Sequence, residues 1–103
     1  MSTATIQAGI CGFTTTVTAQ TVEDTVKLTI TSDCEAIRKL GEHLTSVSPY
    51  KEISFRRAIP LTYQEAMKYC THAACPVPAG IIKAVEVESG LALPADVSIQ
   101  IRK

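Results

Sequence analysis

The stretch "QTVEDTVKLTIT", residues 20–31, carries the clearest structural signal in the chain. Its second half, "VKLTIT", alternates apolar and polar residues, with Val26, Leu28 and Ile30 on one side. A period of two is typical of a β-strand with one buried face. The polar stretch "QTVEDT" before it is typical of a turn, which we expect at residues 22–23. The stretch therefore predicts a turn followed by the second arm of an antiparallel hairpin.

Residues 4–20 supply the first arm of this hairpin, but their pattern is less regular. The apolar residues before Cys11 have even numbers, and those after it have odd numbers. Because glycine tolerates bulge geometry, the change of phase at Cys11–Gly12 predicts a bulge or bend in the strand. A turn at residues 22–23 would then place Cys11 near Cys34.

Three helices are expected after the hairpin. Ser32 and Glu35 fit a capping box that begins the first helix near Cys34, and Thr62 and Glu65 fit a second box. The third helix follows the prolines of "CPVP" and ends at Gly90. The apolar residues that recur at helical spacing are Ile37, Leu40, Leu44 and Val47 in the first helix, Tyr63, Met67 and Cys70 in the second, and Ile81, Ile82 and Val85 in the third.

Two further segments alternate like strands. Residues 51–61 are compatible with an edge strand or an irregular loop, and an edge strand there could serve for dimerisation. The closing stretch "VSIQIRK", residues 97–103, is expected to pair with the hairpin and to direct its apolar residues inward. Residues 1–103 are therefore expected to form a single α+β domain, a small mainly antiparallel sheet with about three helices on one face.

Composition narrows the class of protein. Ten acidic and ten basic residues cancel, so the overall charge favours neither nucleic acid nor an anionic membrane as a partner. No apolar segment is long enough to cross a bilayer, and the N-terminal residues show no signal-peptide pattern. We expect a cytoplasmic protein, in which four cysteines are thiols or metal ligands rather than disulfides.

The four cysteines are the strongest candidates for chemistry. Cys34 and Cys75 are expected at helix N-termini, where free N–H groups and the helix dipole stabilise a thiolate. Cys11 would lie at the strand irregularity and Cys70 at the end of the second helix. Thiolates suit soft metals, so the set could hold zinc or an iron–sulfur cluster, with His72 able to replace one cysteine. The chain has no Cys-x-x-Cys pair, so spacing alone does not establish such a site.

A simpler interpretation is that the cysteines are packed as small apolar residues, as free cysteines often are. Taken singly, each cysteine is better explained in this way, and only the set of four favours a site. His43 is most simply a polar residue on a helix surface. Hydrolase chemistry has little support, because the chain has no G-x-S-x-G, H-E-x-x-H or phosphate-binding glycine loop. A non-enzymatic module that binds an unidentified protein partner or forms a homodimer remains an alternative.

The segment "CPVP", followed by an amphipathic helix that carries Lys83, resembles the Cys-Pro-x-Pro motif of the small sulfur-carrier proteins. In that family the cysteine carries a persulfide, so the resemblance implies that Cys75 acts as a sulfur acceptor. The match covers only residues 75–85 and lies late in the chain, whereas the family has its motif after the first strand. The resemblance is therefore local and concerns Cys75 alone.

Over its whole length the chain resembles a small, functionally uncharacterised prokaryotic family. The segments that carry this resemblance are "AGICGF", "SDCE", "CPVP" and "LALP". The family supplies no activity, so the expected function still depends on the cysteines.

Overall fold

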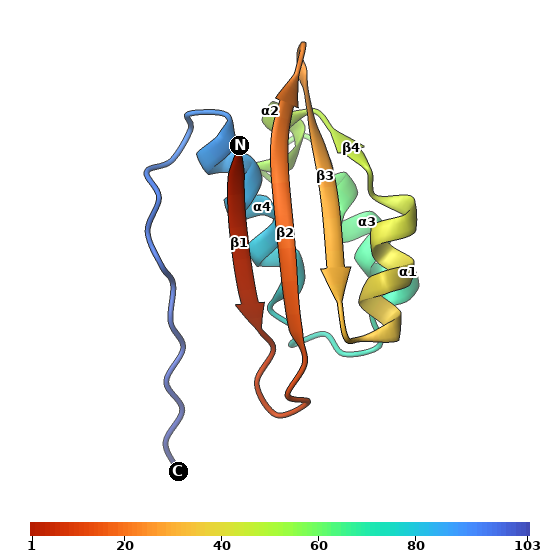
Figure 1. The fold of residues 1–103 in the computed structure, drawn as a ribbon, viewed down its shortest axis with the longest axis vertical. Coiled ribbons are helices and arrows are strands. Elements are labelled where there is room, and N and C mark those ends of the chain that lie inside the picture. The colour runs from red at the N-terminus through yellow and green to blue at the C-terminus, as the bar shows by residue number, and fades with distance from the viewer.

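The computed structural model describes residues 1–103 and contains one antiparallel sheet in the order β1-β2-β3-β4 (Figure 1). The helices lie on one face of this sheet, which confirms the predicted α+β class. The strands are β1 (Ser2–Gln7), β2 (Thr14–Val22), β3 (Thr25–Ser32) and β4 (Ser46–Val47). The helices are α1 (Glu35–His43), α2 (Pro49–Glu52), α3 (Leu61–Tyr69) and α4 (Val77–Glu88). None of them combines the length and the apolar character that a membrane-spanning helix needs.

The hairpin forms as its alternation predicts. β2 and β3 pair in antiparallel register, and Val26 and Leu28 are buried on the face that the helices cover. The turn lies one residue later than expected, because Val22 pairs with Thr25 and leaves residues 23–24 between them. Glu23 has a φ of 58°, in the left-handed region that tight hairpin turns use.

The first arm differs from the expectation. The predicted bulge at Cys11–Gly12 is a complete reversal of the chain, which separates β1 from β2 and makes them an antiparallel pair. The connecting loop, residues 8–13, contains Gly9 and Gly12 at φ values of 91° and 73°. Glycine adopts these angles without the steric cost that a side chain would add.

The core lies between the sheet and the helices. α4 packs on β1 and β2, and α1 packs on β3. The residues that form this core are Val17, Ala19, Val26, Leu28, Ile37, Leu40, Leu44, Val47, Val77, Ile81, Ala84 and Val85. The predicted apolar faces of the first and third helices are thus largely correct, although Val47 belongs to β4 and not to a helix. In α3, by contrast, Met67 is exposed, and the buried residues are Thr62 and Ala66.

Neither predicted capping box is present. The N-cap of α1 is Cys34, and the Ser32 hydroxyl accepts a hydrogen bond from the Cys34 N–H at 3.0 Å instead of capping the helix. The N-terminus of α3 is held by the buried carboxylate of Glu52, which accepts hydrogen bonds from the N–H groups of Leu61 and Thr62. α1 and α3 therefore begin where expected, but a distant residue caps α3, α1 ends earlier than predicted, and α2 was not predicted.

Neither alternating segment forms a strand. Residues 51–61 contain the end of α2, a loop without regular structure and the start of α3, so the dimerisation edge expected there is absent. The closing segment, residues 94–103, is extended alongside β1 (Figure 1) but makes no backbone hydrogen bond to it. Its Val97, Ile99 and Ile101 are 66, 77 and 83% exposed, so the prediction that they face the core is wrong.

Candidate functional site

Three connections meet at one end of the sheet. The loop of residues 8–13, the N-terminus of α1 and the loop of residues 70–76 all lie at the end where β1 and β3 finish (Figure 1). Each of the four cysteines lies on one of these connections. The antiparallel hairpins bring these connections together, although they are far apart in sequence.

A cavity of about 730 Å³ lies between these connections. Its lining contains Cys11, Cys34, Cys70 and Cys75, together with His72. We call this cavity the cysteine pocket. The structure thus brings together all five residues that the sequence proposed as ligands.

Cys34, Cys70 and Cys75 form the inner wall of the pocket. Cys34 is the N-cap of α1, Cys70 is the C-cap of α3, and Cys75 directly precedes Pro76, the N-cap of α4. All three are partly buried and pack against the hydrophobic core. Their backbone positions are therefore fixed by the helices that begin or end beside them.

The three inner thiols are close enough to affect one another electrostatically. The pKa of the Cys70 thiol is raised from 9.0 to about 11, mainly by burial and in smaller part by negative charge on Cys75 and on Cys34. Cys70 therefore carries a neutral thiol at neutral pH. A cation bound among the three sulfur atoms would reverse this effect, because it would favour their anionic forms.

Cys11 lies on the outer wall and is exposed. Its loop is closed by hydrogen bonds from the Ala8 N–H to the Phe13 carbonyl at 3.1 Å and from the Gly12 N–H to the Gly9 carbonyl at 2.9 Å. The strand pairing expected from the sequence would place Cys11 near Cys34. The two residues do line the same pocket, but the reason is that Cys11 follows β1 and Cys34 follows β3, and both strands finish at the same end of the sheet.

The rest of the lining is almost entirely apolar. It contains no Asp, Glu, Lys or Arg side chain. Ile10 and Phe13, both from the loop that carries Cys11, line the pocket and are exposed to solvent. Hard cations such as Mg²⁺ and Ca²⁺ prefer oxygen ligands, so the donor set of this pocket does not suit them.

The two histidines occupy different environments. His72 is exposed and lines the pocket, and its carbonyl accepts a hydrogen bond from the Cys75 N–H at 3.2 Å. His43 is stacked on Tyr69, with ring centroids 4.7 Å apart, and does not line the pocket. His43 is therefore a surface residue of a helix pair, in line with its sequence interpretation.

The ligand groups are not assembled into a finished metal site. No group of three or more His, Cys, Asp or Glu side chains is arranged so that it could hold a metal ion as it stands. The pocket gathers the sulfur atoms at one end of the fold but does not already direct them to a common point. Binding of a metal would therefore require movement, for which the loops of residues 8–13 and 70–76 are the segments without helix or strand structure.

A protein-family model matches residues 2–101. The chain belongs to DUF6951, a family of unknown function. This agrees with the resemblance to a functionally uncharacterised family. The DUF6951 match includes all four cysteines and all but the last two residues of the closing segment. Neither a curated protein nor a solved structure matches the chain.

The apolar lining of the pocket was not predicted from the sequence. Ile10 and Phe13 were assigned to a strand, whereas in this DUF6951 domain they lie on either side of Cys11 in a loop. The signal that could have located the loop was present, because Gly9 and Gly12 flank Cys11 closely. Two glycines within four residues are more typical of a chain reversal than of a strand interior.

Proposed function

We propose that the cysteine pocket binds a soft metal centre, either an iron–sulfur cluster or zinc. The observation that carries this proposal is the convergence of four thiols from separate segments on one cavity that has no carboxylate in its lining. Thiolates are the preferred protein ligands of both centres. In a reducing compartment such as the cytoplasm, the thiols would remain available as ligands.

The shape of the pocket favours a cluster over a bare structural zinc ion. A structural zinc site is usually a closed tetrahedron of four protein ligands. The pocket has a volume of about 730 Å³, and one of its cysteines is exposed. This space accommodates a group of several atoms, or a metal with an open coordination position.

The electrostatics of the inner wall are consistent with a cationic ligand. Beside burial, which is the larger cause, negative charge on Cys75 and on Cys34 raises the pKa of Cys70, so three thiolates without a cation would repel one another. A bound metal would offset this repulsion and displace the proton from Cys70. Cys34, Cys70 and Cys75 would be the inner ligands, and Cys11 or His72 would complete the set from the loops.

The proposal is tested by anaerobic reconstitution with iron and sulfide, and separately with zinc. We expect near-stoichiometric uptake by the wild-type protein and reduced uptake after Cys34→Ser or Cys75→Ser. His72→Ala and His43→Ala form a matched pair, because only His72 lines the pocket. Reduced uptake after His72→Ala but not after His43→Ala would assign His72 as a ligand. Equal uptake by the wild type and all four single cysteine variants would contradict the proposal.

Persulfide transfer through Cys75 is a second candidate, favoured by the location of Cys75 immediately before α4 and by the absence of an assembled metal site. In this reaction the Cys75 thiolate attacks the outer sulfur of a donor persulfide. A new S–S bond forms at Cys75, the S–S bond of the donor breaks, and the donor leaves as a thiolate. No net oxidant is needed, because the donor persulfide already contains sulfur at the required oxidation level.

The two candidates make different predictions for the other cysteines. Incubation with a cysteine desulfurase and cysteine should add one sulfur atom to Cys75 if the protein is a carrier. Cys11→Ser would leave that adduct unchanged, whereas it would lower metal uptake if Cys11 is a ligand. Mass spectrometry of the intact protein and of its peptides distinguishes these outcomes.

A further inference from the structure

The closing segment, residues 94–103, is extended and unpaired, and it lies beside an unpaired sheet edge. Val97, Ile99 and Ile101 alternate with polar residues, which is the pattern of a strand with one buried face. The segment nevertheless makes no backbone hydrogen bond to the sheet, and these three side chains are exposed. Since the family match extends to residue 101, most of this segment belongs to the domain.

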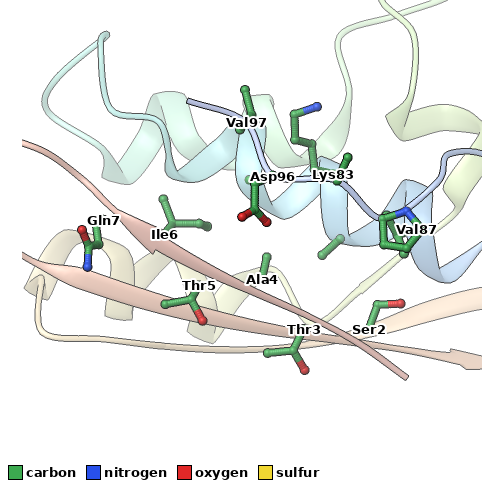
Figure 2. A pocket seen from close by; sticks show the side chains of 14 residues that line it. Ser2, Thr3, Ala4, Thr5, Ile6, Gln7, Lys83, Val87, Asp96 and Val97 are labelled. Atoms are coloured by element: carbon green, nitrogen blue, oxygen red, sulfur yellow. The ribbon is translucent and has the colours of Figure 1, made fainter. Parts of the chain in front are cut away.

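The neighbouring edge of the sheet is equally unpaired. β1 pairs only with β2, so every second residue of β1 directs its N–H and C=O groups away from the sheet. A cleft of about 700 Å³ separates this edge from the closing segment, and α4 forms its floor through Gly80, Lys83, Ala84 and Val87. Figure 2 shows the Asp96 carboxylate directed into this cleft, toward β1.

The direction of the closing segment does not allow it to pair in antiparallel fashion with β1 of the same copy. It runs in the same direction as β1 (Figure 1), whereas every strand pair of the sheet is antiparallel. A second copy related by a two-fold axis perpendicular to the sheet would present its closing segment in the opposite direction. That segment would be antiparallel both to β1 and to the closing segment of the first copy.

The sequence of the segment is complementary to itself in this arrangement. If two copies pair in antiparallel register centred on Ile99, Asp96 of each copy faces Arg102 of the other, and Val97 faces Ile101. Both charged groups are free for this contact, because Asp96 has no ion pair and Arg102 bonds only to the carbonyl of Ile101. Opposite charges at directly facing positions stabilise strand pairs.

We propose that the protein is a homodimer in which each closing segment enters the cleft of the other copy. The combined sheet has the order β1, second closing segment, first closing segment, second β1, and it is antiparallel throughout. The apolar face formed by Val97, Ile99 and Ile101 lies on the helix side, over α4. Such an interface is isologous and leaves no unpaired edge at β1.

Light scattering during size-exclusion chromatography tests the oligomeric state. The full chain should elute at twice its mass of 11.1 kDa. Ile99→Lys should give the monomer, because two lysines would face each other on the apolar side of the interface. Gln100→Lys, on the polar side, is the matched control and should remain dimeric. A monomeric full chain, or a dimer that persists in Ile99→Lys, would overturn the proposal.

A charge exchange tests the register. Asp96→Arg and Arg102→Asp should each raise the dimer dissociation constant by roughly 2- to 30-fold, since each places like charges opposite one another at two symmetric positions. The double variant exchanges the two charges and should restore the wild-type dissociation constant. A double variant as weak as the single variants would exclude the register centred on Ile99. The cysteine pocket lies elsewhere, so these outcomes do not depend on metal binding.

Discussion

Cys70 shows how the local environment controls the chemistry of one residue. It caps the end of α3, packs on the core and lies near two other thiols. These features favour its protonated form, so Cys70 is a poor nucleophile at neutral pH.

The titration of Cys70 should be visible in its alkylation. In metal-free protein, the alkylation rate of Cys70 should have its midpoint at about pH 11 and not at the ordinary value of 9.0. Cys34→Ser should lower this midpoint only in part, because burial is the larger cause. Peptide mass spectrometry measures the alkylation rate against pH, and a wild-type midpoint near 9.0 would contradict the raised pKa of Cys70.

The same shift affects stability. The pKa of Cys70 is higher in the folded than in the unfolded protein. The contribution of Cys70 to the free energy of unfolding is therefore complete below pH 9.0 and is lost as pH rises to about 11.

Glu52 is a second residue whose role depends on burial. The residue is 2% exposed, and its carboxylate accepts hydrogen bonds from the Thr62 N–H at 2.9 Å and from the Thr62 hydroxyl at 2.6 Å. Glu52→Ala should lower the free energy of unfolding by about 2–3 kcal/mol, because it removes charged hydrogen bonds at the N-terminus of α3. Glu42→Ala, on an exposed side of α1, should change it by less than about 0.5 kcal/mol. Urea unfolding measures both, and equal effects would contradict this role.

Among the elements, α4 is tied to the sheet by one carboxylate at its end. Glu88 accepts hydrogen bonds from the Thr21 N–H at 2.8 Å and from the Ser2 hydroxyl at 3.1 Å, and it pairs with the N-terminal amine at 3.1 Å. These contacts join α4 to the first two strands. The hydrogen bond from the Thr21 N–H is the main reason that the pKa of Glu88 falls from 4.5 to about 2.

Glu88 should therefore make the domain sensitive to acid. Because the folded pKa lies below the unfolded value, its stabilisation is complete above pH 4.5 and is lost as pH falls to about 2. Glu88→Gln should be less stable than the wild type at neutral pH, and the difference should shrink over this interval. Glu86→Gln is the control on the same helix. Parallel curves of unfolding midpoint against pH for the wild type and Glu88→Gln would contradict the prediction.

The elements that could be predicted from sequence are those with a strong local signal. The β2–β3 hairpin and the buried face of α4 follow directly from alternation and helical periodicity. The loop around Cys11 was missed although Gly9 and Gly12 signal a reversal, whereas the cap provided by Glu52 was missed because it depends on a partner distant in sequence. The closing segment has the pattern of a strand, but the sheet edge beside it, β1, runs in the same direction, whereas all strand pairs of the sheet are antiparallel. This mismatch is the basis of the proposed dimer.

For the whole molecule, the four cysteines could be proposed as one set from sequence, but their convergence could not. Their spacing follows no known ligand motif, and they meet only because the β1–β2 loop, the N-termini of α1 and α4 and the C-terminus of α3 lie at the same end of the sheet. The four cysteines of the pocket could therefore be predicted from the sequence, but the volume of the pocket and its apolar lining could not.

Ligand binding at this pocket should be coupled to the stability of the whole domain. At 100 times its dissociation constant, zinc would raise the free energy of unfolding by about 2.7 kcal/mol, which corresponds to a rise in Tm of about 10 °C or more. Protons should be released on binding, because a coordinating thiol is deprotonated. Calorimetry in buffers of different ionisation enthalpy measures this release, and Cys75→Ser should abolish most of it. A Tm that does not change with zinc would contradict zinc binding at the pocket.

The most direct test of the cysteine pocket is the metal and sulfide content of protein purified without oxygen and without a His-tag, together with its visible absorption spectrum. We predict near-stoichiometric zinc, or iron and sulfide with a visible charge-transfer band. A colourless, metal-free protein that is folded and cannot be reconstituted would contradict a metal centre in this pocket.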